Sequence, residues 1–207
     1  MEIQQAIDEC RAQPLSGWEL VAYAQSLVQQ HMAYAVDNST DTPQAAFEKG
    51  RGYCYHHAHV MCDLIDALGF QCQIVYAFRT FFPEVVVSGV QLRRLTSGHM
   101  WCRVRLDGAT QDVCSCDPGN APGKLHFRPK SKVRPLTPLI DRLTYRGSAG
   151  QNARRQSKVE AIRKKQDARW IPELCPCKKT SCERYRKCSE CRDYHASRNN
   201  RPACERY

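Results

Sequence analysis

The sequence lacks the long apolar segment that a membrane-spanning helix needs. No run of 18 consecutive apolar residues occurs in its 207 residues, so we expect no transmembrane span. Residues 1–5 also lack the basic and apolar regions with which a secretory signal peptide begins. These absences lead us to expect a soluble, cytoplasmic protein with no membrane partner.

Acidic residues are scarce in the last part of the chain. Residues 151–207 contain 16 Lys and Arg but only 7 Asp and Glu, a net charge of +9, whereas residues 1–150 contain 15 and 14. Residues 146–152 are small, polar and Gly-containing, which is typical of a linker. We therefore predict a globular domain over residues 1–145, a linker and basic helix over residues 146–170, and a cysteine-rich module over residues 171–207.

Cysteine, by contrast, is abundant. The chain has 13 cysteines, an odd number that cannot all pair in internal disulfides. In a reducing cytoplasm, thiols are first interpreted as metal ligands, nucleophiles or small buried side chains. Six of them lie within residues 175–204 and seven are scattered through the first domain, so we interpret the two groups separately.

The hydrophobic pattern of the first domain changes from a helical period to a strand period. Apolar residues at helical spacing predict helices near residues 3–10, 17–34, 43–47 and 54–68. Alternation from residue 71 predicts a strand, and Asp107-Gly108 predicts a two-residue hairpin turn. Residues 80–97 are ambiguous, since Pro83 favours a loop. Helices followed by an antiparallel sheet indicate the α+β fold class.

Cys54 occupies a position that activates a thiol. It follows Gly50 and Gly52 and opens a predicted helix, where free N–H groups and the helix dipole favour an anion. That placement lowers a thiol pKa, and the same N–H groups could stabilise an oxyanion. A nucleophile also needs a base and an acceptor that orients the base. His99 on a predicted strand and Asp112 on the returning strand fall on one face and can supply both.

The sequence around these positions resembles the transglutaminase-like superfamily over roughly residues 17–117. The resemblance rests on Gly52-Tyr53-Cys54-Tyr55-His56-His57-Ala58, on Ala67-Leu68-Gly69-Phe70, on Gln73-Ile74-Val75-Tyr76, and on His99-Met100-Trp101 with Val104 and Asp107-Gly108. It implies a papain-like core in which the helix that carries the cysteine packs against an antiparallel sheet. It also implies that Cys54 is the nucleophile, that His99 is the general base and acid, and that an aspartate on the returning strand completes the triad.

The third member of this triad has more than one candidate. Many superfamily members place the aspartate six residues after the hairpin glycine, where this sequence has Cys114. Asp112 lies four residues after Gly108 and is the preferred candidate, with Asp117 as the alternative. We interpret the other scattered cysteines as core or strand-packing residues: Cys10, Cys62, Cys72, Cys102, Cys114 and Cys116.

The last stretch of the chain has the spacing of a metal site. Its pattern C-x-C-x4-C-x5-C-x2-C-x3-H-x8-C offers seven ligands: Cys175, Cys177, Cys182, Cys188, Cys191, His195 and Cys204. Because the stretch has little apolar mass, its folding would depend on cross-linking. Structural zinc suits these spacings, an iron–sulfur cluster is the alternative, and disulfides come third. The stretch is similar to short cysteine-rich modules at the C-terminus of bacterial proteins.

Together these features predict a cysteine hydrolase that cleaves an amide in a peptide or protein substrate through a thioester on Cys54. Transfer of the acyl group to an amine is a variant of the same chemistry, and neither reaction requires a cofactor. The rival hypothesis is an inactive transglutaminase-like binding module whose zinc tail docks on a protein or nucleic acid. Nucleic acid is not favoured, because the basic tail has few aromatic residues and no recognisable reading motif.

Overall fold

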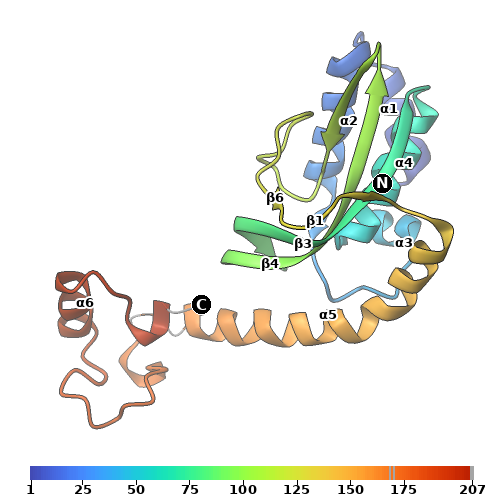
Figure 1. Cartoon of the computed structure of the whole chain (residues 1–207). Coiled ribbons are helices and arrows are strands. Elements are labelled where there is room, and N and C mark those ends of the chain that lie inside the picture. The colour runs from blue at the N-terminus through green and yellow to red at the C-terminus, as the bar shows by residue number, and fades with distance from the viewer. Residues whose placement is uncertain (168, 170, 206–207) are drawn as a thin grey trace. The chain divides into compact units, whose positions relative to one another are not determined.

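Four helices form the N-terminal part of the fold in the computed structural model, which describes residues 1–167, 169 and 171–205 (Figure 1). Their bounds are α1(Ile3–Arg11), α2(Gly17–His31), α3(Pro43–Glu48) and α4(Cys54–Ala67). The predicted helices are therefore present within a few residues of the expected ends. The N-cap Thr42 accepts a hydrogen bond from the backbone N–H of Ala45 at 3.2 Å, which fixes the start of α3.

An antiparallel sheet follows the helices. It contains the long strands β3(Gln71–Val87) and β4(Val90–Leu106), then β5(Ala109–Val113), β6(Arg128–Pro129) and β7(Arg134–Pro135). The order is β5-β4-β3-β6, with β7 also paired to β3. A separate parallel pair joins β1(Ala33–Tyr34) to β2(Arg51–Gly52). The α+β fold class predicted from the sequence is confirmed.

The ambiguous residues 80–97 belong to a second hairpin. At both hairpin turns, two consecutive residues have positive φ: 50° and 76° at Asp107 and Gly108, and 48° and 76° at Ser88 and Gly89. This is the backbone of a type I′ turn, whose twist matches that of the strands. Pro83 is tolerated within β3 because β6 pairs with this strand only at residues 80 and 81. The missing N–H of Pro83 therefore costs no hydrogen bond between β3 and β6.

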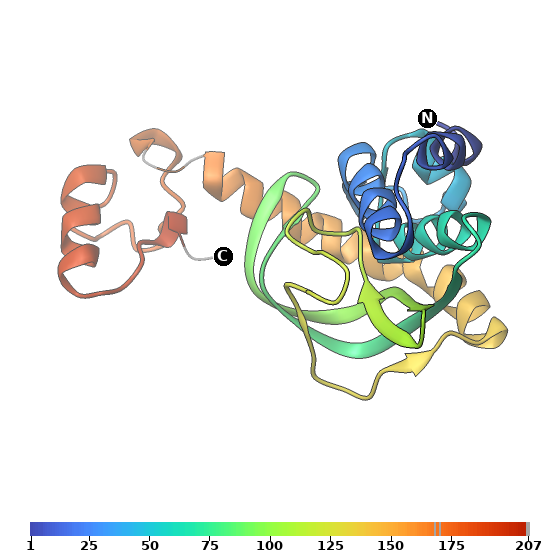
Figure 2. The same cartoon turned by 90° about the horizontal axis from the view of Figure 1, so that it is seen from above.

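Helix α4 is central to the packing. It contacts β3 and β4 as well as α1, α2 and α3, and Figures 1 and 2 show α1, α2 and α4 on one face of the sheet. Its apolar residues Met61, Leu64 and Ile65 are fully buried in the main core cluster, together with Cys10 and Cys102. The nucleophile predicted at the start of α4 is therefore held by a helix that packs against both the sheet and the other N-terminal helices.

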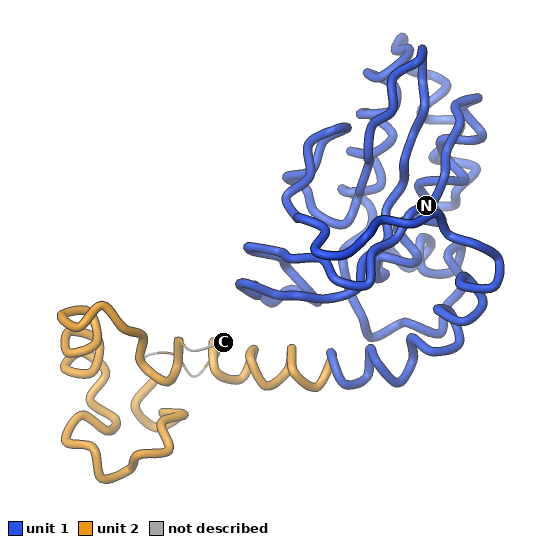
Figure 3. Tube along the Cα trace, viewed as in Figure 1, with its two compact units in different colours: residues 1–155 blue, residues 156–207 orange. Residues whose placement is uncertain are grey.

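The chain divides into two compact units, Met1–Arg155 and Gln156–Tyr207 (Figure 3). Residues 146–152, which we expected to be a linker, are helical and lie within α5(Pro138–Asp167). Glycine at 147 and 150 disfavours a helix, but the side chains of Ser148 and Asn152 are buried in the first unit. The Tyr53 hydroxyl donates to Ser148 Oγ at 2.8 Å, so tertiary contacts hold this segment in a helix.

The second unit contains the end of α5 and three short elements. These are η1(Pro172–Leu174), α6(Cys188–Ser197) and η2(Ala203–Glu205). The guanidinium groups of Arg184 and Arg198 lie 3.9 and 4.6 Å from the ring centre of Tyr194, so cation–π contacts help to order the unit. None of the helices in the described part of the chain is long and apolar enough to cross a bilayer.

Candidate active site

Cys54 is the first residue of α4, as the sequence predicts. The preceding Tyr53 is the N-cap and has extended backbone angles. Gly52 cannot carry a side chain, because a Cβ there would lie 2.3 Å from Met32 Cε and 2.7 Å from His56 Nδ1. The pairing of β2 with β1 and this tight approach together fix the position at which the helix begins. Cys54 is only 6% exposed.

His99 lies on β4 in an aromatic surrounding. Its ring centre is 4.7 Å from that of Phe127 and 5.0 Å from that of Phe82, both edge-on, and 5.8 Å from that of Trp101. The residue is 3% exposed. Three packed rings restrict the imidazole to one orientation, which general acid–base catalysis needs.

The structure brings Cys54 and His99 together at one pocket of about 420 Å³. Burial is the largest single influence and raises the pKa of the Cys54 thiol, but the N–H group and the positive charge of His99 lower it. The positive charge of Arg155 and the backbone N–H of Met100 act in the same direction. The net effect is a lowered pKa, which is the property of a nucleophilic cysteine.

Cys114 occupies the position behind His99. Its Sγ lies 3.4 Å from His99 Nε2, whereas Nδ1 has no hydrogen-bond partner among the described residues and is the nitrogen left for Cys54. Burial lowers the pKa of His99, but the charge and hydrogen bond of Cys114, followed by those of Cys54, raise it to about 9. Burial likewise raises the pKa of Cys114, but a hydrogen bond from Cys116 and the charge of His99 bring it to about 5.

The structure does not bring Asp112 to His99. Asp112 faces Arg103 across the β4–β5 pair and forms an ion pair with it, with Arg103 Nε 2.8 Å from Asp112 Oδ1. Arg103 is four residues from His99, which is about 13 Å along a strand. The alternative, Asp117, accepts a hydrogen bond from the Gly119 N–H at 2.8 Å. One feature of the sequence could have indicated Cys114 as the partner of His99: it occupies the position at which many superfamily members have the aspartate.

A positively charged side chain that no sequence motif indicated also lines the pocket. Arg155 of α5 lines it, with one guanidinium nitrogen 2.5 Å from Ser97 Oγ and another 3.1 Å from Asn152 Oδ1. The Asn152 side chain is fully buried, and its amide nitrogen has no hydrogen-bond partner among the described residues. Arg155 and Asn152 thus line the same cavity as the thiol.

The two histidines after Cys54 have structural roles. His56 Nε2 bonds the Asp41 carbonyl at 2.9 Å, and His57 Nδ1 bonds Ser115 Oγ at 3.0 Å. Burial is the main cause that lowers their pKa values, to about 4 for His56 and about 3 for His57. Both rings are therefore neutral at neutral pH and serve as buried hydrogen-bonding groups.

The seven predicted metal ligands of the tail lie in the second unit. Burial raises the pKa of Cys191, and so do the nearby thiols of Cys204, Cys175, Cys177 and Cys182. No three of the seven ligand atoms lie within 4.8 Å of one another in the described residues. The structure gathers metal-ligating groups more tightly in the first unit, in two sets: Cys62, Cys72 and Cys102, and His99, Cys114 and Cys116. Of these residues, sequence spacing indicates only Cys114 and Cys116 as a possible metal-binding pair, and we interpreted that pair as strand packing.

Comparison with known proteins gives a family for this arrangement. The model of the transglutaminase-like superfamily matches residues 4–112, which include Cys54 and His99. No curated protein matches the chain. Among solved structures, a proposed cysteine protease from Cytophaga hutchinsonii is similar over 65% of this chain, with 12% identity and a TM-score of 0.40. The chain spans about half, 47%, of that protein.

Proposed function

Because the chain belongs to the transglutaminase-like superfamily, we propose that it is a cysteine hydrolase that cleaves an amide bond in a peptide or protein substrate. One observation carries the proposal: Cys54 and His99 line the same pocket, and His99 lowers the pKa of the Cys54 thiol against the effect of burial. Such a pair provides a thiolate nucleophile and a proton donor at neutral pH.

The first half-reaction forms a thioester on Cys54. The thiolate attacks the carbonyl carbon of the amide and produces a tetrahedral oxyanion. The first N–H groups of α4 have no acceptor within the helix and would donate to that oxyanion. The His99 imidazolium gives its proton to the leaving nitrogen, the C–N bond breaks, and the amine departs.

The second half-reaction releases the acid. His99 is now neutral and takes a proton from a water molecule, whose oxygen attacks the thioester carbon. The C–S bond breaks, the Cys54 thiolate reforms, and the imidazolium is restored. Cys114 orients the ring through Nε2 in both steps, the role that a carboxylate has in a triad. An amine in place of water would give acyl transfer.

The pocket lining supports a substrate with apolar and polar parts. Phe78 and Leu143 line the pocket and are 62% and 56% exposed, so they can pack against an apolar side chain of a bound peptide. Arg155 lines the same cavity and can bind a carbonyl or carboxylate of the substrate. We therefore expect cleavage next to an apolar residue.

The test is incubation with a proteome-derived peptide library, scored by mass spectrometry for both cleavage and amine cross-links. We expect the parent chain and the control Cys10→Ala, which changes a buried thiol outside the site, to cleave a common set of peptides. Cys54→Ala should lose that cleavage. If Cys54→Ala still processes every peptide that the parent accepts, the proposal is wrong. Peptide binding without turnover in the parent would favour the inactive binding module.

We further propose that the cysteine-rich module of residues 171–207 binds structural zinc. The ligand spacing of the tail supports this, and the thiols of Cys204, Cys175, Cys177 and Cys182 lie near enough to Cys191 to raise its pKa. The soft ligand set suits zinc or an iron–sulfur cluster. Elemental analysis of anaerobically purified protein distinguishes the two, and the absence of both metals would contradict the proposal.

A further inference from the structure

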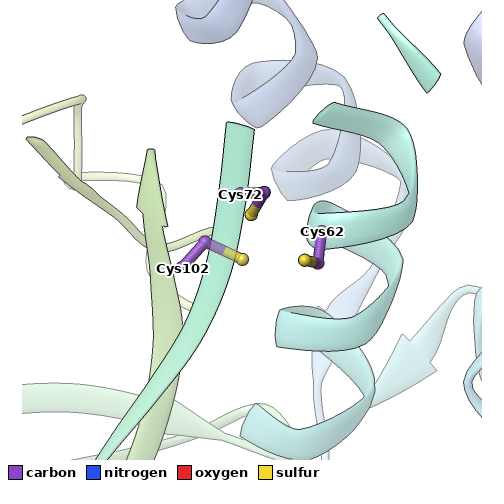
Figure 4. A group of neighbouring side chains, drawn as sticks. All are labelled: Cys62, Cys72 and Cys102. Carbon is purple, nitrogen blue, oxygen red and sulfur yellow. The ribbon is translucent and has the colours of Figure 1, made fainter. Parts of the chain in front are cut away.

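Three thiols of the first unit converge on one point away from the candidate active site. Cys62 lies on α4, Cys72 near the start of β3, and Cys102 on β4. Their sulfur atoms all lie within 4.8 Å of one another. Figure 4 shows the three side chains pointing toward one another from the helix and from the two strands.

The register of the sheet explains why the two strand cysteines meet. Ile74 pairs with Cys102, so Cys72, two residues earlier on β3, has its side chain on the same face as Cys102. Helix α4 covers that face, and Cys62 comes from the side of α4 that packs against it. The Cys102 thiol donates to the Ala58 carbonyl of α4 at 3.2 Å, which holds its sulfur toward the helix.

The spacing of the sulfurs fits a single metal ion. Thiolates bind zinc at about 2.3 Å, so three of them around one ion are about 4 Å apart. The three sulfur atoms already lie within 4.8 Å of one another, so small rotations of the side chains are enough to bring them to that separation. No backbone movement is required, because the three residues come from elements that are already packed together.

Asp66 and the degree of burial favour zinc over a softer ion. Asp66 Oδ2 lies 3.8 Å from Cys62 Sγ, and its Oδ1 accepts the Cys72 N–H at 3.1 Å. A carboxylate beside three sulfurs suits Zn²⁺, whereas Cu⁺ prefers sulfur ligands alone. Cys102 is fully buried, but Cys62 and Cys72 are only partly buried, so an ion can reach the group from solvent.

We propose that Cys62, Cys72 and Cys102 form a zinc site in the first unit, with Asp66 beside the open coordination position. Binding would release thiol protons to solvent and would tie α4 to β3 and β4. The site is independent of the seven ligands in the tail and takes no part in the acyl transfer.

The direct test is metal protection of individual thiols in the full-length, reduced protein. The chain is stripped with a chelator, then treated with a maleimide with and without Zn²⁺, and each cysteine is scored by peptide mapping. We expect zinc to suppress alkylation of Cys62 and Cys72, whereas Mg²⁺ should have no effect. Equal alkylation with and without zinc would overturn the proposal. This readout needs no substitution and does not depend on the fate of Cys54.

Metal content provides the second test. Cys62→Ser and Cys72→Ser replace partly buried residues and should each lose one zinc equivalent per chain relative to Cys10→Ala. Protection of Cys62 and Cys72 should persist in Cys191→Ser, which changes only the tail. Retention of the full zinc content by both Cys62→Ser and Cys72→Ser, or a stable Cys62–Cys72 disulfide in the protein purified under reducing conditions, would overturn the proposal.

Discussion

Replacement of Cys114 by alanine is the most direct test of how the site is charged. The Cys114 Sγ lies 3.4 Å from His99 Nε2. Burial lowers the pKa of His99, and the charge and hydrogen bond of Cys114 are the largest influences that raise it to about 9. In Cys114→Ala those two influences disappear, and the burial of the ring remains.

The size of the effect follows from the pKa values. A fall in the pKa of His99 from about 9 to its ordinary value of 6.5 corresponds to about 3 kcal/mol, or about 300-fold in the protonation equilibrium. At pH 7 that fall reduces the imidazolium from nearly all to about a quarter of the molecules, and the Cys54 thiol loses much of the charge that lowers its pKa. A thiol with the ordinary pKa of 9 is only about 1% ionised at pH 7, so we expect Cys114→Ala to lower both the alkylation rate of Cys54 at pH 7 and kcat/KM by up to about 100-fold.

The assay is the rate of Cys54 alkylation by iodoacetamide between pH 5 and 10, scored by peptide mapping. In the parent, the rate should stay high well below the ordinary thiol pKa. In Cys114→Ala, the rise should move toward pH 9, the ordinary value for a thiol. Cys114→Asp restores a negative charge and should keep the parent profile. Cys114→Ser keeps a hydrogen-bonding group without the charge and should resemble alanine.

One result would refute this reasoning. If the alkylation profiles of the parent and Cys114→Ala coincide, and both proteins give the same circular dichroism spectrum, then Cys114 does not set the charge of His99. Cys10→Ala is the matched control, because it also removes a buried thiol but lies in the core outside the site.

Three further predictions concern stability, substrate binding and the tail. The neutral His56 and His57 should make unfolding easier in acid: their folded pKa values are about 4 and 3, below the ordinary 6.5, so only the unfolded chain is protonated in between. Stability is then fully present above pH 6.5 and falls by roughly 5 kcal/mol for His57 as the pH drops to 3, which urea unfolding at several pH values would measure. Arg155→Gln should lower kcat/KM about tenfold or more, because it removes a charge-assisted contact, whereas Arg155→Lys should keep part of the activity; equal kinetics for the parent and Arg155→Gln would exclude a role. Cys191→Ser should lower the metal content of the tail without changing Cys54 alkylation, and unchanged metal content would exclude Cys191 as a ligand.

Local signals account for the parts of the fold that the sequence predicted. The helices from α1 to α4 follow from apolar spacing and caps, and the turn at Asp107-Gly108 follows from residues that accept positive φ. Cys54 was recognisable because a helix start is itself a local feature. His99 was a plausible base from spacing alone, because it shares a strand face with Asp112, and the resemblance to the superfamily motif added to that prediction.

The parts that could not be predicted depend on contacts between distant segments. Residues 146–152 have a linker composition, yet Ser148 bonds Tyr53, 95 positions away, and α5 continues through both glycines. Arg155 reaches the pocket only because α5 docks in this way. Likewise, Cys62, Cys72 and Cys102 have no regular spacing, and only the strand register and the packing of α4 bring their sulfurs together.

The prediction of Asp112 depended on the register of the hairpin. The hairpin turn pairs Arg103 with Asp112, and a pairing so far from His99 cannot orient its ring; two residues further along, Cys114 can. A thiol replaces a carboxylate in this position only if it is ionised at neutral pH. The Cys116 thiol favours this ionisation, because it donates a hydrogen bond to Cys114. Cys116 itself stays protonated, since burial first and then Cys114 raise its pKa far above the ordinary value. With a pKa of about 5, Cys114 carries a negative charge over the same neutral pH range as an aspartate, so the site keeps the charge of the triad although sulfur has replaced oxygen.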